Sequence, residues 1–161
     1  MKPLNTTNGA GLPALPKITV VTPVFNGSGY ISATLDSVLN QVYPSLEYIV
    51  VDGGSTDGTL NIIRSYQFSN NFPQEISLVI SEPDHGMYDA IAKGFEHATG
   101  EIFCYLNADD LFECSGLQSV GESFARHPEA QVIYHEDTVL VDGWKYPNAA
   151  QPENINTADL L

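Results

Sequence analysis

Residues 46–58 read Leu46-Glu-Tyr-Ile-Val-Val-Asp-Gly-Gly-Ser-Thr-Asp-Gly58, and the rest of the fold can be worked out from them. The first six residues are mostly apolar, which predicts a strand over residues 46–51. Because the apolar side chains are consecutive, we expect burial on both faces of the strand, as in a parallel sheet. The glycines and polar residues that follow predict a tight loop, and Thr56 or Asp57 is expected to cap a helix over 58–67.

The same order of strand, turn and helix recurs on both sides of this stretch. Further strands are predicted over 17–26, 76–80, 101–106 and 130–135, and further helices over 30–42, 87–98 and 114–126. This alternation predicts an α/β fold with right-handed crossovers, a mostly parallel sheet and helices on both faces. Ser28 is a candidate cap for the helix over 30–42. Met87, Ile91, Phe95 and Ala98 are expected on one side of the helix over 87–98.

The ends of the chain lack a periodic pattern. Residues 1–16 are expected to form a flexible lead-in, and 147–161 an irregular tail, which leaves one domain over 17–146. Near its end, residues 139–141 precede Asp142-Gly143, a pair typical of a β-hairpin turn.

The composition excludes several classes of function. Among 161 residues there are 20 acids and 6 bases, a formal net charge of −14, which disfavours nucleic acid and anionic lipid as partners. The six bases are scattered, so no cluster of them could neutralise a diphosphate. A phosphate-bearing ligand would therefore need a divalent metal ion. No stretch is a signal peptide or long enough to span a bilayer, so we expect a cytoplasmic protein that reaches the inner face of a membrane only indirectly.

Polar side chains gather where the predicted strands end. In open α/β sheets, ligands bind beyond the carboxyl ends of the strands. We therefore expect these residues to converge on one rim: Asn26, Asp52, Asp84, Asn107, Asp109 and Asp110.

The sequence Asn107-Ala-Asp-Asp110 directly follows an apolar strand. Carboxylate and amide oxygens suit Mg²⁺ or Mn²⁺, and Mg²⁺ needs only one or two protein carboxylates when phosphates and water complete its shell. The alternative is a turn with a helix-capping Asp. The position at the end of a strand, in a chain with few bases, favours the metal site.

Asp52 begins the glycine-rich loop within residues 46–58. The glycines permit close approach of the backbone, as in a phosphate-binding loop. However, two carboxylates flank the loop and it contains no Lys. A carboxylate in this position is better suited to the hydroxyl groups of a ribose or to the edge of a base.

Four motifs in this order resemble the inverting GT-A glycosyltransferases, in a family 2-like branch that builds bacterial surface polysaccharides. The motifs are Thr22-Pro-Val-Phe-Asn26, Val50-Val-Asp-Gly-Gly-Ser-Thr-Asp-Gly-Thr59, Glu82-Pro-Asp-His-Gly-Met-Tyr-Asp-Ala90 and Leu106-Asn-Ala-Asp-Asp110. The resemblance implies a Rossmann-like GT-A fold. It also implies a nucleotide-diphosphate sugar donor, a saccharide or lipid-linked saccharide acceptor, and Mn²⁺ or Mg²⁺.

The resemblance also implies roles for individual residues. Pro23, Val24 and Asn26 would line the nucleotide pocket, Asp52 would contact the base or ribose, Asp84 would lie near the nucleotide, and Asp109 would bind the metal with Asp110 close by. Asn107 stands where the family's metal motif has its first acid. The family's general base is expected beyond Leu161, so the domain would be incomplete. A fragment that binds a nucleotide sugar without transferring it is the alternative.

Overall fold

The computed structural model describes residues 14–133, 138–141 and 144–147. The chain divides into two compact units, residues 1–129 and 130–161. The elements of the first unit are β1 (Ile18–Val24), α1 (Ile31–Leu39), β2 (Leu46–Asp52), α2 (Thr59–Gln67), β3 (Leu78–Ser81), α3 (Met87–Glu96), β4 (Ile102–Tyr105) and α4 (Gly116–Arg126). The second unit contains β5 (Thr138–Val141) and β6 (Trp144–Pro147).

The first unit is built on a four-stranded parallel sheet with the order β3-β2-β1-β4. The chain adds β2 and β3 on one side of β1 and then returns to add β4 on the other side. The order therefore reverses between β1 and β4. In such sheets the crevice at the carboxyl ends of the two strands beside this reversal is the usual place for a ligand.

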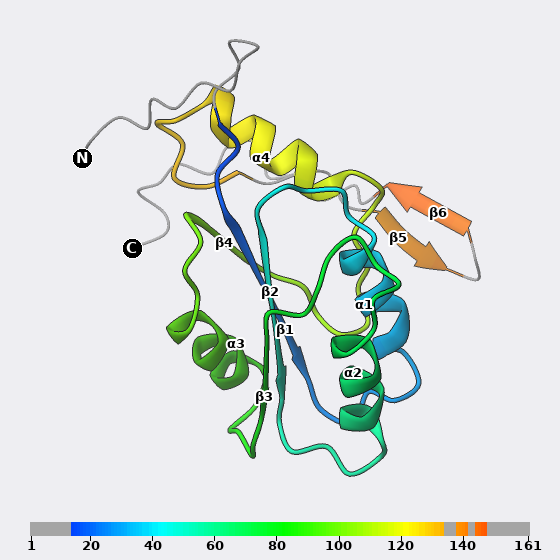
Figure 1. Ribbon diagram of the computed structural model, residues 1–161. Helices are drawn as coiled ribbons and strands as arrows, with labels where there is room; N and C mark the ends of the chain where they lie inside the picture. The colour runs from blue at the N-terminus through cyan, green and yellow to red at the C-terminus, as the bar shows by residue number, and fades with distance from the viewer. Residues whose placement is uncertain (1–13, 134–137, 142–143, 148–161) are drawn as a thin grey trace. The chain divides into compact units, whose positions relative to one another are not determined.

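Helices cover both faces of the sheet, as the sequence predicted (Figure 1). On one face, Val20 and Val50 belong to a core with Leu35 of α1 and Ile63 of α2. On the other face, Val21, Ile49 and Val51 pack with Ala90 of α3. Strand β1 is buried at every position, because its alternate side chains enter two different cores.

Helix α3 buries the predicted side only in part, because Ile91 is buried and Phe95 packs against the core, whereas Met87 does not join them. Its buried residues are Ala90, Ile91 and Gly94, whereas Met87 is 41% exposed. A Cβ added at Gly94 would lie 2.5 Å from Cγ1 of Val21, so this helix lies unusually close to β1. Small residues on the inner side permit this approach, and Met87 is left at the edge of the interface.

The predictions for the end of the chain had mixed outcomes. Strands β5 and β6 pair antiparallel with Val141 opposite Trp144, which confirms the predicted hairpin, although residues 142–143 themselves are not described. The strand predicted over 130–135 is wrong for its described part, because residues 130–133 form no strand. Residues 1–13, 134–137 and 148–161 lie outside the described residues. Within the described part of the chain, no helix is both long and apolar enough to cross a membrane.

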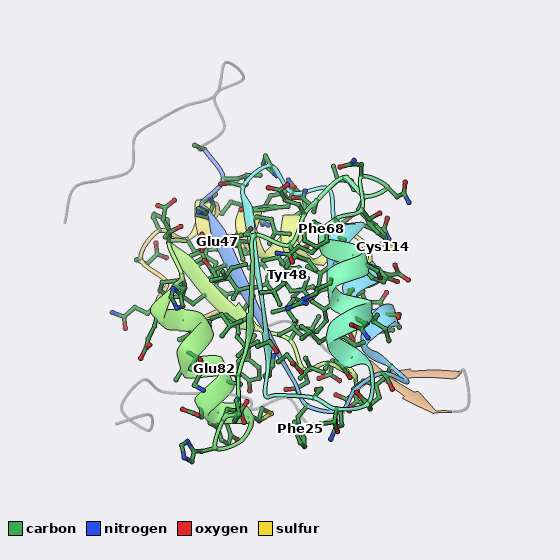
Figure 2. All side chains as sticks on the ribbon, turned by 60° about the horizontal axis from the view of Figure 1, so that its bottom comes forward. Phe25, Glu47, Tyr48, Phe68, Glu82 and Cys114 are labelled. Atoms are coloured by element: carbon green, nitrogen blue, oxygen red, sulfur yellow. The ribbon has the colours of Figure 1, made fainter. Side chains whose placement is uncertain are left out.

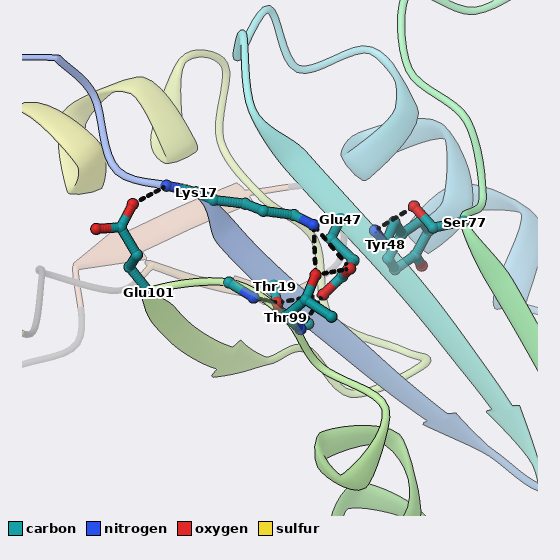
Figure 3. A network of polar contacts seen from close by, with 8 residues as sticks. Lys17, Thr19, Glu47, Tyr48, Ser77, Thr99 and Glu101 are labelled. Atoms are coloured by element: carbon teal, nitrogen blue, oxygen red, sulfur yellow. Dashed lines mark hydrogen bonds and ion pairs between the residues drawn. The ribbon is translucent and has the colours of Figure 1, made fainter.

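A polar network ties together the amino ends of the strands (Figure 3). The Glu47 carboxylate accepts hydrogen bonds from Lys17 Nζ at 2.9 Å, Thr19 Oγ1 at 2.6 Å, Thr99 N at 2.7 Å and Thr99 Oγ1 at 2.6 Å. Glu47 precedes the buried part of β2, and Thr99 lies in the turn before β4. This network joins β1, β2 and the approach to β4, at the end of the sheet opposite the polar rim.

Candidate functional site

A cleft of about 640 Å³ opens at the carboxyl ends of the parallel strands. Phe25, which lines it, lies at the opposite end of the sheet from Glu47 (Figure 2). The cleft is lined by Pro23, Val24, Phe25, Tyr30, Gly53, Asp84, Gly86, Met87, Ala90, Asn107, Ala108 and Asp109. These residues come from the end of β1, from the segments that follow β1, β2, β3 and β4, and from the start of α3, so the strand ends converge as the sequence predicted.

Five of the predicted site residues line this cleft, namely Pro23, Val24, Asp84, Asn107 and Asp109. Pro23 and Val24 are the last residues of β1, and Asn107 and Asp109 follow β4. They flank the reversal point of the sheet from both sides. Three further predicted residues, Asn26, Asp52 and Asp110, do not line the cleft and make internal contacts instead.

Asp52 is completely buried at the end of β2. Its carboxylate accepts a hydrogen bond from Ser81 Oγ at 2.7 Å and from the Ser55 N–H at 3.2 Å. It therefore joins the end of β3 to the loop that follows β2. In this structure the residue shapes the loop beside the cleft.

Asn26 links the loop after β1 to the loop after β2. Its side-chain Oδ1 accepts the Thr56 N–H at 2.9 Å, and its own N–H donates to Ser55 Oγ at 2.8 Å. Asn26 has a φ of 50°, a left-handed conformation that Asn tolerates better than most residues. The side chain thus orders the rim of the site.

Asp57 strengthens the same link. Its carboxylate accepts the Ser28 N–H at 2.9 Å and the Thr59 N–H at 3.0 Å. The residue therefore binds a first-turn N–H of α2, although the N-cap position itself belongs to Gly58, with a φ of 98°. Neither Thr56 nor Ser28 caps its predicted helix, because Gly58 and Tyr30 occupy the N-cap positions without side-chain cap bonds.

The turn after β4 contains an unusual polar atom. Asn107 Nδ2 donates to Asp110 Oδ2 at 2.9 Å, and this bond orients the amide. The other amide atom, Oδ1 of Asn107, is buried without a hydrogen-bond partner, and no other described side chain has such an atom. A buried acceptor without a partner costs free energy, about 1–3 kcal/mol in typical cases. A ligand held beside Asn107 and the exposed Asp109 would remove this cost.

Gly53 explains how Asp84 reaches the cleft. A Cβ added at Gly53 would lie 2.5 Å from Asp84 Oδ2, so only glycine permits this approach. Gly54 has a φ of 84°, which favours glycine, and lies in ordinary contact with Pro83. The loop after β2 therefore packs directly against the loop after β3.

Exposed apolar side chains form part of the cleft wall, and sequence reasoning missed them. Phe25, Tyr30 and Met87 are 60%, 44% and 41% exposed. Phe25 was included in a strand pattern and Met87 in a buried helical pattern. The available signal was their position directly beside the polar strand ends.

Among the described residues no Lys or Arg lines the cleft, whereas two carboxylates, those of Asp84 and Asp109, do. Within the described residues no three His, Cys, Asp or Glu side chains cluster closely enough to hold a metal ion by themselves. A cation bound here would have ligands such as Asp109 and the Asn107 amide oxygen, and a phosphate-bearing ligand would have to complete its shell. Mg²⁺ is a cation that uses few protein carboxylates.

Comparison with known proteins shows that this chain is similar to glycosyltransferases. A family model described as Glycosyl transferase family 2 matches residues 19–159. The PGL/p-HBAD biosynthesis glycosyltransferase of Mycobacterium bovis (strain BCG / Pasteur 1173P2) is 34% identical over 122 residues, which are 75% of this chain and 46% of that protein. The putative teichuronic acid biosynthesis glycosyltransferase TuaG of Bacillus subtilis (strain 168) is 36% identical over 103 residues, 64% of this chain and 40% of that protein.

A solved structure extends the comparison. The mannosyltransferase PcManGT from Pyrobaculum calidifontis, in complex with GDP-Man and Mn²⁺, has a TM-score of 0.61 and 29% identity, covering 77% of this chain and 35% of that one. The chain therefore spans less than half the length of these relatives. The parallel sheet with helices on both faces is the expected GT-A, Rossmann-like fold. With the family model covering most of its length, the chain belongs to glycosyl transferase family 2.

Proposed function

We propose that this chain binds a nucleotide-diphosphate sugar in the cleft, for transfer of the sugar with inversion to an acceptor hydroxyl in cell-surface polysaccharide synthesis. The observation that carries the proposal is the buried, unpartnered Oδ1 of Asn107 beside Asp109, in a cleft that no described Lys or Arg lines. A bound divalent cation satisfies both features at once. It gives the amide oxygen a partner and supplies the positive charge that a diphosphate requires.

The residues at the turn after β4 fit such an ion. Asp109 offers an exposed carboxylate, and Asp110 holds the Asn107 amide in one orientation. Asp109 and Asn107 would hold Mn²⁺ or Mg²⁺, with Asp110 as the adjoining group. When bound, the ion would stabilise the negative charge that develops on the departing diphosphate. The complex of PcManGT with GDP-Man and Mn²⁺ supports this choice of ion.

The other cleft residues would bind the nucleotide. Pro23 and Val24 form the wall at the end of β1, and Asp84 lies on the opposite side near Gly53. Contact of Asn26 and Asp52 with the nucleotide stays a prediction. In this structure both residues hold the loop after β2, of which Gly53 lines the cleft.

The acceptor would be a saccharide or a lipid-linked saccharide. A general base must take the proton of its hydroxyl as that oxygen attacks the sugar. We assign no general base among the described residues. For the 161-residue chain by itself, donor binding without transfer is therefore the alternative. A product assay with UDP- and GDP-sugars distinguishes the two, since binding without any released nucleotide favours the alternative.

The proposal is tested by calorimetric titration of the chain with uridine diphosphate and guanosine diphosphate, with and without Mn²⁺. We expect one of the two to bind in the presence of Mn²⁺, and Asp109→Ala or a chelator to weaken that binding at least about tenfold. The matched control is Glu75→Ala, which removes an exposed acid remote from the cleft. Equal affinity in the wild type, after chelation and in Asp109→Ala would rule out the metal assignment.

A further inference from the structure

Lys93 lies on α3 and reaches back to the loop that precedes this helix. Its Nζ donates to the Pro83 carbonyl at 3.0 Å and pairs with Glu82 Oε1 at 2.9 Å. A weaker pair joins it to Asp89 Oδ2 at 3.7 Å. The side chain is only 23% exposed, and it does not line the cleft. Lys93 therefore contacts the residues directly before Asp84 from behind the site.

The same loop is held to α3 by two further contacts. Asp89 Oδ2 accepts the His85 N–H at 3.0 Å, and Asp84 Oδ1 accepts the Gly86 N–H at 2.8 Å. These bonds set the backbone on the helix side of Asp84. Lys93 connects to them through Asp89, so one cation links both ends of the loop.

On its other side the loop meets the glycines after β2. Asp84 lies against Gly53, and Pro83 lies against Gly54. Such close packing leaves little room for the Asp84 carboxylate to shift toward β2. Its position in the cleft therefore depends on what holds the loop from the α3 side, where Lys93 bonds the carbonyl adjacent to it.

The acidic groups around Lys93 also connect it to Asp84. Hydrogen bonding to Glu82 is the largest cause that raises the pKa of Lys93, with smaller contributions from the charges of Asp89 and Asp84. Lys93 thus stays protonated at neutral pH. Its charge lies close enough to Asp84 to offset part of the negative potential on that side of the cleft.

We propose that Lys93 is a positioning residue for donor binding, which holds Asp84 in place through the Pro83 carbonyl without touching the ligand. The inference rests on the proposed function, because it assumes that the cleft takes a nucleotide diphosphate. It adds a residue from outside the cleft to those that determine donor affinity.

The chain contains a matched control at the other end of the sheet. Lys17 Nζ also pairs with a glutamate, Glu47, at 2.9 Å and makes a second hydrogen bond, to Thr99 Oγ1. Its side chain is 36% exposed, against 23% for Lys93. Lys17→Met and Lys93→Met therefore remove equivalent interactions, of which one lies far from the cleft and the other beside it.

The experiment measures the Kd of uridine and guanosine diphosphate with Mn²⁺ in the wild type, Lys93→Met, Lys93→Arg and Lys17→Met. Substituting a residue that orients a binding group typically costs about 10–100-fold in affinity, so we expect Lys93→Met to raise Kd about tenfold. Lys93→Arg keeps the charge and should recover part of the affinity. Lys17→Met should lower the thermal midpoint while leaving Kd unchanged.

A second measurement needs no nucleotide. Amide hydrogen exchange of His85 and Gly86 reports local opening of the loop, and it should accelerate in Lys93→Met but not in Lys17→Met. Unchanged Kd in Lys93→Met, or equal losses in both Met variants, overturns the inference while the proposed function stands. If the wild type binds neither nucleotide, the proposed function fails and the role of Lys93 in donor binding fails with it. The exchange rates then show separately whether Lys93 holds the loop.

Discussion

At the scale of single residues, the site depends on close approaches that few side chains permit. The clearest is Gly53, whose missing Cβ leaves space for the Asp84 carboxylate. The site also depends on the Asn107 amide. Its nitrogen donates a hydrogen bond to Asp110, which leaves its oxygen available for a ligand. Both features set where oxygen atoms lie in the cleft, which decides what the cleft can bind.

We predict that Gly53→Ala destabilises the chain and displaces Asp84. Overpacking at a buried position typically costs about 1–3 kcal/mol, and here the clash is with the end of the Asp84 side chain, which has to turn away to relieve it. Chemical denaturation should show the lower stability, and calorimetry should show weaker nucleotide binding. Gly29→Ala is the matched control, because an added Cβ there meets nothing within 4 Å. Equal stability and affinity of the two variants would contradict the close approach.

At the scale of elements, two loops act as one unit. The loop between β1 and α1 and the loop between β2 and α2 are joined by Asn26 and Asp57, and by the Gly27 N–H, which donates to Thr59 Oγ1 at 2.8 Å. Since the loops follow neighbouring parallel strands, bonds between them fix the rim from both sides. The bond from Gly27 also ties the start of helix α2 to these loops, because Thr59 is the first residue of α2.

We predict that Asp57→Ala loosens this rim although Asp57 is not in the cleft. The hydrogen bond from Thr59 is the largest cause that keeps the pKa of Asp57 below its usual range, so the charged form is the one the rim needs. The thermal midpoint should fall and nucleotide affinity should weaken. Asp57→Asn keeps an acceptor oxygen and should lose less on both measures. A larger loss in Asp57→Asn than in Asp57→Ala would show that the carboxylate is not acting as an acceptor for these N–H groups.

At the scale of the whole molecule, the Glu47 network predicts how stability depends on pH. Burial opposes the charged form of Glu47, but the hydrogen bonds that the carboxylate receives outweigh it and lower its pKa from 4.5 to about 2. A carboxyl group with a lower pKa in the folded state contributes stability above its unfolded pKa. That contribution is lost as the pH falls from about 4.5 to about 2.

Urea denaturation of the wild type and Glu47→Gln from neutral pH down through this window would measure the contribution. We expect the wild type to be more stable at neutral pH, and the difference between the two proteins to shrink steadily as the pH falls. A difference that is independent of pH would show that Glu47 acts through packing alone. Nucleotide affinity at neutral pH should be the same in both, because the network lies at the far end of the sheet (Figure 2).

Much of the fold was predictable because it depends on local pattern. The run over 46–51 became β2, buried as expected, and the alternation of elements predicted the parallel sheet. The described part of the strand predicted over 130–135 failed, since a short apolar pattern does not specify a strand without a partner to pair with. The inner side of α3 was predicted only in part, because Ala90 and Gly94 let the helix approach β1 at a point that helical periodicity does not show, and Met87 stays partly exposed.

The α/β class, the family and the strand ends at which polar residues collect could all be inferred from the amino-acid sequence, because each follows from patterns along neighbouring residues. The folded arrangement was needed to show which of those residues enter the cleft: Asp84, Asn107 and Asp109 do, whereas Asn26, Asp52 and Asp110 bond to the loops around it. A polar side chain at a strand end can either face a ligand or satisfy a neighbouring backbone group. The outcome depends on atoms that the fold brings near from distant parts of the chain. The pattern of neighbouring residues does not show which atoms these are.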